Sequence, residues 1–276
     1  MNCSGIGPIG VCGWSVNNDL DLLGRLRDKT GVDRIHLSLN PALDGQAGYA
    51  ERFLNAGWTI SATMVGFAQE DYTTLDTIKR TGGIVPEDVW PQNKNRVLKA
   101  IQLTRQIGVP YLEFHFGFID TADRTAFARL AEKAKELADA AADHDVVLLM
   151  ETGQETAATL RTFIEAVNHP ALAVNFDPGN MILYGQGDPV EAVRMLGRWI
   201  RHVHIKDALP ASKAGQWGSE VPWATGCVNA DVFLTALVKG GYHGALSIER
   251  EAGANRLGDI ESAIGHLSSW RHSDAG

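Results

Sequence analysis

The chain has few cysteines and no long hydrophobic run. Three of its 276 residues are cysteines, Cys3, Cys12 and Cys227, and their odd number and wide spacing argue against a disulfide framework or a paired-cysteine metal motif. No apolar stretch approaches the roughly 20 residues that cross a bilayer as a helix. The N-terminus also lacks the basic and apolar regions of a secretory signal. We therefore expect free thiols, no membrane partner and a cytoplasmic location.

Positive charge is also scarce. The 25 lysines and arginines are outnumbered by 33 aspartates and glutamates, which gives a formal net charge of −8 and a pI near 5.6. An overall negative charge repels the phosphate backbone of DNA and RNA. The sequence thus predicts no nucleic-acid partner.

A convincing dinucleotide-binding glycine motif is missing as well. The stretch Gly5-Ile-Gly-Pro-Ile-Gly10 has the letters of GxGxxG. It contains a proline, however, and it comes before the first apolar run, whereas the motif belongs after a strand. An open doubly wound sheet that binds a dinucleotide is therefore disfavoured.

Short apolar runs alternate with longer helical patterns along most of the chain. Eight runs read as strands: 9–14, 34–39, 59–65, 111–116, 146–151, 173–177, 200–205 and 244–248. Helical patterns cover 19–30, 47–56, 93–107, 121–143, 156–167, 189–196 and 231–239. Strands that alternate with helices favour a parallel sheet, and eight of them favour closure into a (β/α)₈ barrel. We expect an α/β protein with one TIM-barrel domain across residues 1–276.

The predicted strand 200–205 carries an unusual polar face. Residues two apart in a strand share a face, so His202 and His204 point the same way, and Lys206 continues that face past the strand end. A single strand histidine is usually a satisfied core or edge residue. Two imidazoles and an ammonium on one face indicate a polar site instead. His202 lies one layer deeper, where we expect it to pair with Glu113.

Three other predicted strands end on a carboxylate: Glu151, Asp177 and Glu249. In a parallel barrel these ends meet His204 at one rim, and three carboxylates with one imidazole suit a single Mn²⁺, Mg²⁺, Co²⁺ or Zn²⁺ ion. The alternative for each carboxylate alone is a helix cap or an arginine partner. The shared position of all four favours a metal site.

Four motifs resemble those of the xylose isomerase-like TIM-barrel superfamily of sugar-phosphate isomerases and epimerases. That group includes ketose 3-epimerases, hydroxypyruvate isomerases and inosose dehydratases. The resemblance implies that Glu151, Asp177, His204 and Glu249 are the metal ligands. The motifs are Met150-Glu-Thr-Gly153, Phe176-Asp-Pro-Gly-Asn180, His202-Val-His-Ile-Lys-Asp207 and Ser247-Ile-Glu249.

The chain departs from two relatives at named positions. Ketose 3-epimerases usually carry a histidine where this chain has Asn180 and an arginine where it has Pro210. The related endonuclease IV branch uses three zinc ions and a histidine at the position of Asn180, where an amide is a poor zinc ligand. DNA repair is therefore disfavoured, and the His-Val-His-Ile-Lys-Asp form is closer to the hydroxypyruvate isomerase and inosose dehydratase relatives.

The predicted chemistry is proton removal next to a carbonyl. A divalent ion that chelates a carbonyl and a neighbouring hydroxyl of a small sugar or keto acid stabilises the enediolate. Glu151 then acts as the base, and Glu249 or a protonated partner returns a proton, as in an isomerase or epimerase of carbohydrate metabolism. The first alternative is a metal-dependent lyase or dehydratase acting on a keto-sugar or inosose. The second is a barrel that binds sugar without catalysis.

Further polar and aromatic residues are expected around the substrate. Lys206 stands at the mouth, where it either reaches a substrate oxygen or is a solvated rim lysine. His115 is a candidate hydrogen-bond partner, Glu155 either enters the site or begins the next helix, and Trp14 forms an apolar wall or part of the core.

Two irregular segments follow predicted strands and so emerge at the same rim. Residues 67–90 and 213–226 are rich in aromatic residues and glycine. We expect these loops to close over the site and exclude water. The alternative is a subunit interface in a homo-oligomer, since exposed tryptophans favour one.

Overall fold

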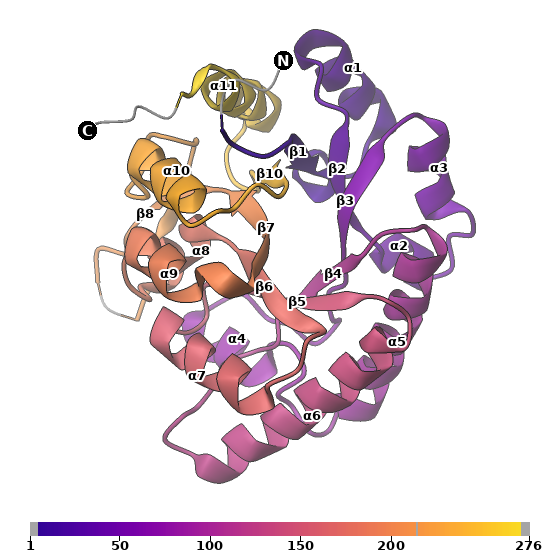
Figure 1. The fold of residues 1–276 in the computed structure, drawn as a ribbon, viewed down its shortest axis with the longest axis vertical. Coiled ribbons are helices and arrows are strands. Elements are labelled where there is room, and N and C mark those ends of the chain that lie inside the picture. The colour runs from indigo at the N-terminus through magenta and orange to yellow at the C-terminus, as the bar shows by residue number, and fades with distance from the viewer. Residues whose placement is uncertain (1–4, 214, 272–276) are drawn as a thin grey trace.

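The computed structural model describes residues 5–213 and 215–271, and within them eight parallel strands close into a barrel (Figure 1). Hydrogen bonds link the strands in the order β1-β10-β7-β6-β5-β4-β3-β2, and β2 also pairs with β1 to close the barrel. The predicted TIM-barrel fold is thus confirmed. The barrel strands are β1 (Ile9–Cys12), β2 (Arg34–Ser38), β3 (Thr59–Met64), β4 (Tyr111–Phe114), β5 (Val147–Glu151), β6 (Leu172–Phe176), β7 (Ile200–Ile205) and β10 (Leu246–Ile248).

Helices surround the barrel on its outside (Figure 1). In the part of the chain that the structure describes, no helix combines the length and apolar character needed to cross a membrane. The α-helices are α1 (Leu20–Thr30), α2 (Asn40–Leu43), α3 (Tyr49–Asn55), α4 (Leu75–Thr81), α5 (Trp90–Gln106), α6 (Arg124–Ala142), α7 (Ala157–Val167), α8 (Pro178–Tyr184), α9 (Pro189–Leu196), α10 (Ala230–Lys239) and α11 (Arg256–Ser269).

Short polar side chains set where several of these helices begin. Asp19 and Asp123 accept hydrogen bonds from backbone N–H groups in the first turns of α1 and α6. Thr156 and Asp188 do the same for α7 and α9. Each such cap typically contributes about 1 kcal/mol to stability. Because each cap sets the residue at which its helix begins, it also sets where the preceding loop ends.

The molecule has an apolar layer outside the barrel and a polar layer inside it. On β7, Val203 and Ile205 face the helices and are fully buried in the hydrophobic core. His202 and His204 alternate with them and face the barrel interior, where they are also fully buried. The predicted period of two is confirmed on this strand, and it delivers the polar residues to the inside.

Some elements differ from the sequence prediction. The first strand ends at Cys12 rather than at residue 14, because a 3₁₀ turn (Gly13–Val16) follows it. The segment 67–90 is not wholly irregular, since Thr74 begins α4 through a capping box with Thr77. The helices α2, α8 and α11 were not predicted. The first two have 4 and 7 residues, too few to show a helical period.

The described cysteines carry free thiols, as expected. Cys12 is buried in β1 and Cys227 is exposed. Cys3 lies outside the described residues.

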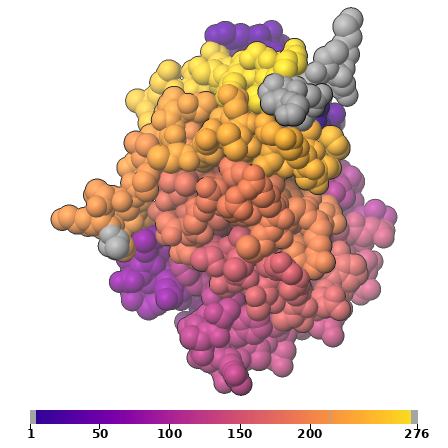
Figure 2. Space-filling model, turned by 60° about the vertical axis from the view of Figure 1, so that its left-hand side comes forward, coloured from indigo at the N-terminus to yellow at the C-terminus, as the bar shows by residue number. Residues whose placement is uncertain are grey.

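A two-stranded antiparallel hairpin leaves the barrel directly after β7. It comprises β8 (Asp207–Leu209) and β9 (Ser219–Val221), and the orange segment that contains it projects from the body of the molecule at the left of Figure 2. Asp207 closes the base of this segment. Its Oδ1 accepts backbone hydrogen bonds from Ala208 at 2.8 Å and Val228 at 3.0 Å, and its Oδ2 accepts one from Gly226 at 2.9 Å.

We predict that Asp207→Ala lowers the free energy of unfolding by about 3 kcal/mol, because buried backbone N–H groups lose a charged acceptor. Urea denaturation followed by circular dichroism measures the change. Asp143→Ala, at an exposed position after α6, is the control and should stay within about 0.5 kcal/mol of the parent. Equal stability of the two variants would contradict the anchoring role.

Candidate functional site

Four side chains with metal-ligand atoms meet at the carboxyl end of the barrel. One ligand atom from each lies within 4.8 Å of the others, and all four residues are buried. Nδ1 of His204 is 2.9 Å from Oε1 of Glu151, 3.5 Å from Oδ2 of Asp177 and 3.4 Å from Oε2 of Glu249. The structure thus brings together the four residues that the strand ends singled out.

Two oxygens in this cluster are buried without a hydrogen-bond partner. They are Oε1 of Glu151 and Oδ2 of Asp177. Nδ1 of His204 is close to both, and when this nitrogen carries no proton neither oxygen has a donor. A buried carboxylate oxygen without a donor is costly. Oxygens and a ring nitrogen that converge without bonding to one another fit a shared divalent cation, so the residues present fit a metal.

The chain reaches this geometry through Asp177, which serves two purposes. Its Oδ1 accepts the backbone N–H of Asn180 at 2.8 Å and so caps α8. This bond orients the carboxylate and leaves Oδ2 for the cluster. The helix-cap alternative raised from the sequence is therefore correct for one oxygen and does not compete with the other.

Two motif glycines let the strand ends approach closely. A Cβ on Gly179 would lie 2.6 Å from Cγ of Lys206, and a Cβ on Gly153 would lie 2.5 Å from Cβ of Asn180. Gly153 also has a φ of +138°, which favours glycine. The glycines of the two motifs thus allow the loops after β5 and β6 to pack against each other and against β7.

The second oxygen of each glutamate in the cluster has its own donor. Oε2 of Glu151 lies 2.9 Å from Nε2 of His115. Oε1 of Glu249 accepts from the indole of Trp14 at 2.6 Å, and its Oε2 accepts from Lys206 at 2.9 Å. These donors orient the carboxylates toward the centre.

Lys206 is a buried ammonium at the edge of the cluster. Its Nζ donates to Glu249 and to Oε2 of Glu251, both at 2.9 Å, and lies 3.9 Å from Asp177. Burial favours the neutral amine, but the charges of Glu249 and Glu251 outweigh it and raise the pKa of Lys206. The side chain is only 4% exposed, so it is part of the site and not a solvated rim lysine.

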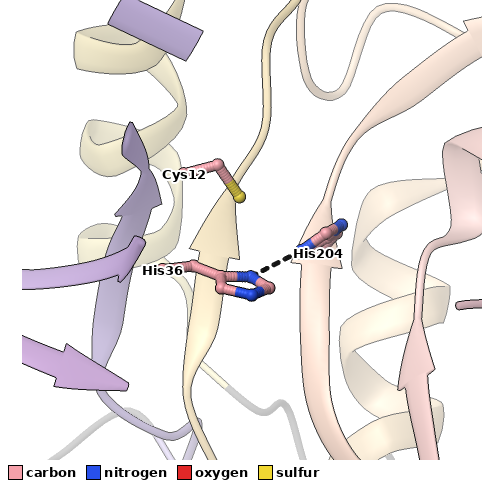
Figure 3. Close-up of side chains that lie close together, drawn as sticks. All are labelled: Cys12, His36 and His204. Carbon is pink, nitrogen blue, oxygen red and sulfur yellow. Dashed lines mark hydrogen bonds between the residues drawn. The ribbon is translucent and has the colours of Figure 1, made fainter. Parts of the chain in front are cut away.

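Beneath the cluster, imidazole side chains lie in the barrel interior. Nδ1 of His36 forms a hydrogen bond with Nε2 of His204 at 3.0 Å (Figure 3). Burial and the charge of His204 lower the pKa of His36 to about 3. Cys12 faces the same layer, and burial raises the pKa of its thiol to about 12. This layer is therefore built from neutral groups.

The expected pair between Glu113 and His202 does not form. His202 lies 2.8 Å from Oδ1 of Asn175 and 3.1 Å from Oγ of Ser247. Those partners stand on β6 and β10, the neighbours of β7, whereas β4 lies elsewhere in the barrel. Glu113 instead approaches His36, with its Oε2 4.0 Å from Nε2.

Two residues of the cluster, Glu151 and Glu249, line a cavity of about 660 Å³. Of the expected substrate residues, Trp14, His115 and Lys206 line it, and Glu155 does not; Glu155 is buried, and burial raises its pKa to about 8. Both rim segments contribute lining residues, so they emerge at the predicted rim. The lining residues are Trp14, Ser38, Asn40, Met64, Val65, Gly66, Glu70, Tyr72, Glu113, His115, Glu151, Asn180, Leu183, Tyr184, Lys206, Trp217, Gly218, Glu220, Glu249 and Glu251.

Sequence reasoning missed several residues of this wall. Glu251 and Glu220 come from loops or the hairpin, and Tyr184 comes from the short helix α8. None of them stands on a strand of the barrel, so the period of two of the barrel strands could not have placed them. Glu251 sits two residues after Glu249, which was the available signal.

The arrangement can bind a cation and hold a small polar molecule beside it. The cavity volume lies in the range of small-molecule sites. Tyr184 and Trp217 pack at 4.7 Å between ring centroids and supply an apolar wall, while the glutamates supply acceptors for hydroxyl groups. The site therefore suits a hydroxyl-rich ligand with an oxygen directed at the cluster.

Comparison with solved structures supports the fold. The chain is 31% identical to a xylose isomerase domain protein from Planctomyces limnophilus, with a TM-score of 0.84 and 96% of each chain covered. It is 20% identical to L-ribulose 3-epimerase (TM-score 0.70, covering 97% of this chain and 100% of that one). It is 17% identical to the probable 3-DHS dehydratase AsbF of Bacillus anthracis (TM-score 0.72, 96% and 99%).

No curated protein matches the chain. A family model described as xylose isomerase-like TIM barrel matches residues 56–270, which include β3 to β10 and all four residues of the cluster. The chain therefore belongs to the xylose isomerase-like TIM barrel family.

Proposed function

We propose that this protein is a divalent-metal-dependent isomerase or epimerase that removes a proton from the carbon beside the carbonyl of a small keto sugar. The observation that carries the proposal is the convergence of Glu151, Asp177, His204 and Glu249, two of whose buried oxygens lack a hydrogen-bond partner. Glu151 and Glu249 of this cluster line a cavity of about 660 Å³. Similarity to an epimerase fold is consistent with it.

Glu151 is suited to remove the proton. A divalent ion held by the four ligands would polarise the carbonyl and stabilise negative charge on its oxygen. Oε2 of Glu151 faces His115 at 2.9 Å and not the cluster centre, so this oxygen can accept a proton while Oε1 stays with the ligands. His115 then donates to the same carboxylate, which keeps it oriented.

Glu249 is suited to stand on the other side of the substrate. Trp14 and Lys206 each donate to one of its oxygens, so the carboxylate is held in place from two directions. The ammonium of Lys206 can supply a proton to Glu249 or to a substrate oxygen. An epimerase or isomerase needs this second group to return a proton at the end of the reaction.

The charge of the cavity favours a neutral substrate. Glu70, Glu220 and Glu251 line it in addition to the ligands. Among the described lining residues there is no arginine, and Lys206 already contacts two carboxylates. A phosphate or carboxylate would face repulsion, whereas sugar hydroxyls can donate to these glutamates. A keto sugar therefore suits the cavity better than a keto acid.

A dehydratase is the second candidate, and Lys206 favours it. Elimination also begins with removal of the α-proton, but it requires an acid for the departing hydroxyl. The buried ammonium of Lys206 borders the ligands and the cavity, where it could protonate that hydroxyl. A fold similar to that of AsbF is consistent with this reading.

We predict about one divalent ion per chain in purified protein, and loss of that ion in Asp177→Ala and His204→Ala, because each variant removes one of four ligands. Elemental analysis after gel filtration measures the ratio. Asp143→Ala serves as the control and should retain the ion. Full occupancy in both ligand variants would refute the metal assignment.

We predict that a keto sugar turned over by the protein exchanges deuterium from D₂O at the carbon beside the carbonyl. Glu151→Gln should slow this exchange about 10²-fold to 10⁴-fold, since it removes the base. Proton NMR follows the label, and the melting temperature reports on the fold. A panel of ketoses and inososes that binds without any exchange would instead indicate a sugar-binding barrel without catalysis.

Lys206→Met separates the two enzyme candidates. In a dehydratase the variant should lose elimination at least about a hundredfold while α-exchange continues, because the acid is lost and the base is not. Mass spectrometry distinguishes the reactions, since only the dehydratase product is lighter by one water. An isomeric product from the parent enzyme, of unchanged mass apart from the label, would rule out the dehydratase.

A further inference from the structure

His204 has a neighbour at each of its ring nitrogens. Nδ1 faces the three carboxylates, and Nε2 forms a hydrogen bond with Nδ1 of His36 at 3.0 Å. The amide nitrogen of Asn175 is 3.3 Å from Nδ1 and 3.2 Å from Nε2, but an amide nitrogen donates and does not accept. Nδ1 of His36 can accept, so His36 is the neighbour that can take a proton from Nε2.

This arrangement restricts where protons can sit once His204 holds a cation. A ligating Nδ1 needs its lone pair and carries no proton, so the proton of the neutral ring is on Nε2. Nε2 must then donate, and Nδ1 of His36 must accept. A neutral His36 has its own proton on Nε2, which points toward Glu113 at 4.0 Å.

We propose that His36 is a positioning residue for the metal site, which fixes the tautomer and ring orientation of His204 by accepting its Nε2 proton. The inference rests on the metal-dependent function proposed above and adds a residue on β2, on the far side of β1 and β10 from β7. Both rings are fully buried, so water does not replace the acceptor.

The surroundings of His36 agree with an accepting role. The His36 ring packs against Trp14 at 4.9 Å and against His202 at 4.7 Å between centroids, both edge to face. These contacts hold the ring plane. The carboxylate of Glu113 is too far for a normal hydrogen bond, so His36 is not held as a cation.

A second metal site is the competing interpretation. Cys12, His36 and His204 have ligand atoms within 4.8 Å of one another (Figure 3). Such an ion would need Nε2 of His204, and a ring that binds one ion at Nδ1 and another at Nε2 must lose both protons. The 3.0 Å hydrogen bond already uses that nitrogen, and Sγ of Cys12 is directed at the carbonyl of Ser247 at 4.0 Å. We therefore favour the positioning role.

Two variants at one position test it. His36→Leu removes the acceptor, whereas His36→Asn offers an amide oxygen near the place of Nδ1. We expect His36→Leu to weaken Mn²⁺ binding about 10-fold to 100-fold and His36→Asn to retain most of the affinity. Competition with a chromogenic chelator measures the dissociation constants. His202→Leu is the control, because it removes a buried imidazole from the same layer without removing the acceptor for His204.

The ring protons can be observed directly, without activity or substitution. In ¹⁵N-histidine NMR of the metal-free protein, His36 should carry its proton on Nε2 and leave Nδ1 unprotonated. A proton on Nδ1, or His36→Leu protein that is folded and binds Mn²⁺ like the parent, would overturn the proposal. So would a second bound ion that is lost in Cys12→Ala. If the parent protein binds no ion while the predicted tautomer is observed, the proposed function fails and with it the role of His36.

Discussion

The constraint that governs this structure is the burial of several carboxylates in one place. Moving a carboxylate away from water costs roughly several kcal/mol, as for other buried ions, unless opposite charges and hydrogen bonds offset this penalty. Glu151, Asp177 and Glu249 are each less than a tenth exposed. Their compensation comes from different elements: an imidazole, an indole, an ammonium and a helix N-terminus. The buried carboxylates thus require a donor from each of these elements.

The fold separates the residues that hold it together from those that act. The apolar faces of the strands meet the helices and form the hydrophobic core, while the opposite faces turn into a barrel filled with polar rings. Stability therefore rests chiefly on contacts outside the barrel, so the interior can hold groups that would be poor core residues. A polar side chain inside the barrel still needs hydrogen-bond partners. Each ring nitrogen of His202, for example, has one.

Much of this could be predicted from the sequence, because strand period and strand ends are local properties. The eight strands, the inward face of β7 and the carboxylates at the strand ends can each be recognised from residues close together in the chain. The pairing of Glu113 could not be predicted, since it depends on which strands face each other across the barrel. The contacts of Trp14 with Glu249 and of His115 with Glu151 also depend on tertiary distance. Residues such as Tyr184 enter from a helix too short to recognise.

Lys206 and Asp207 are neighbours in sequence but face opposite directions, one toward the cavity and the other into the base of the hairpin segment. Asp207 closes the base of this segment, which we call the hairpin module. Glu220 joins the module to Arg250, and the backbone N–H of Gly218 joins it to Leu183 of α8. The module carries Trp217 and Gly218 to the cavity wall. None of the four residues of the cluster belongs to this module, so the sequence of the module can change while the residues of the cluster stay the same. Substitutions in this module would therefore reshape the cavity wall without replacing any of the four residues of the cluster.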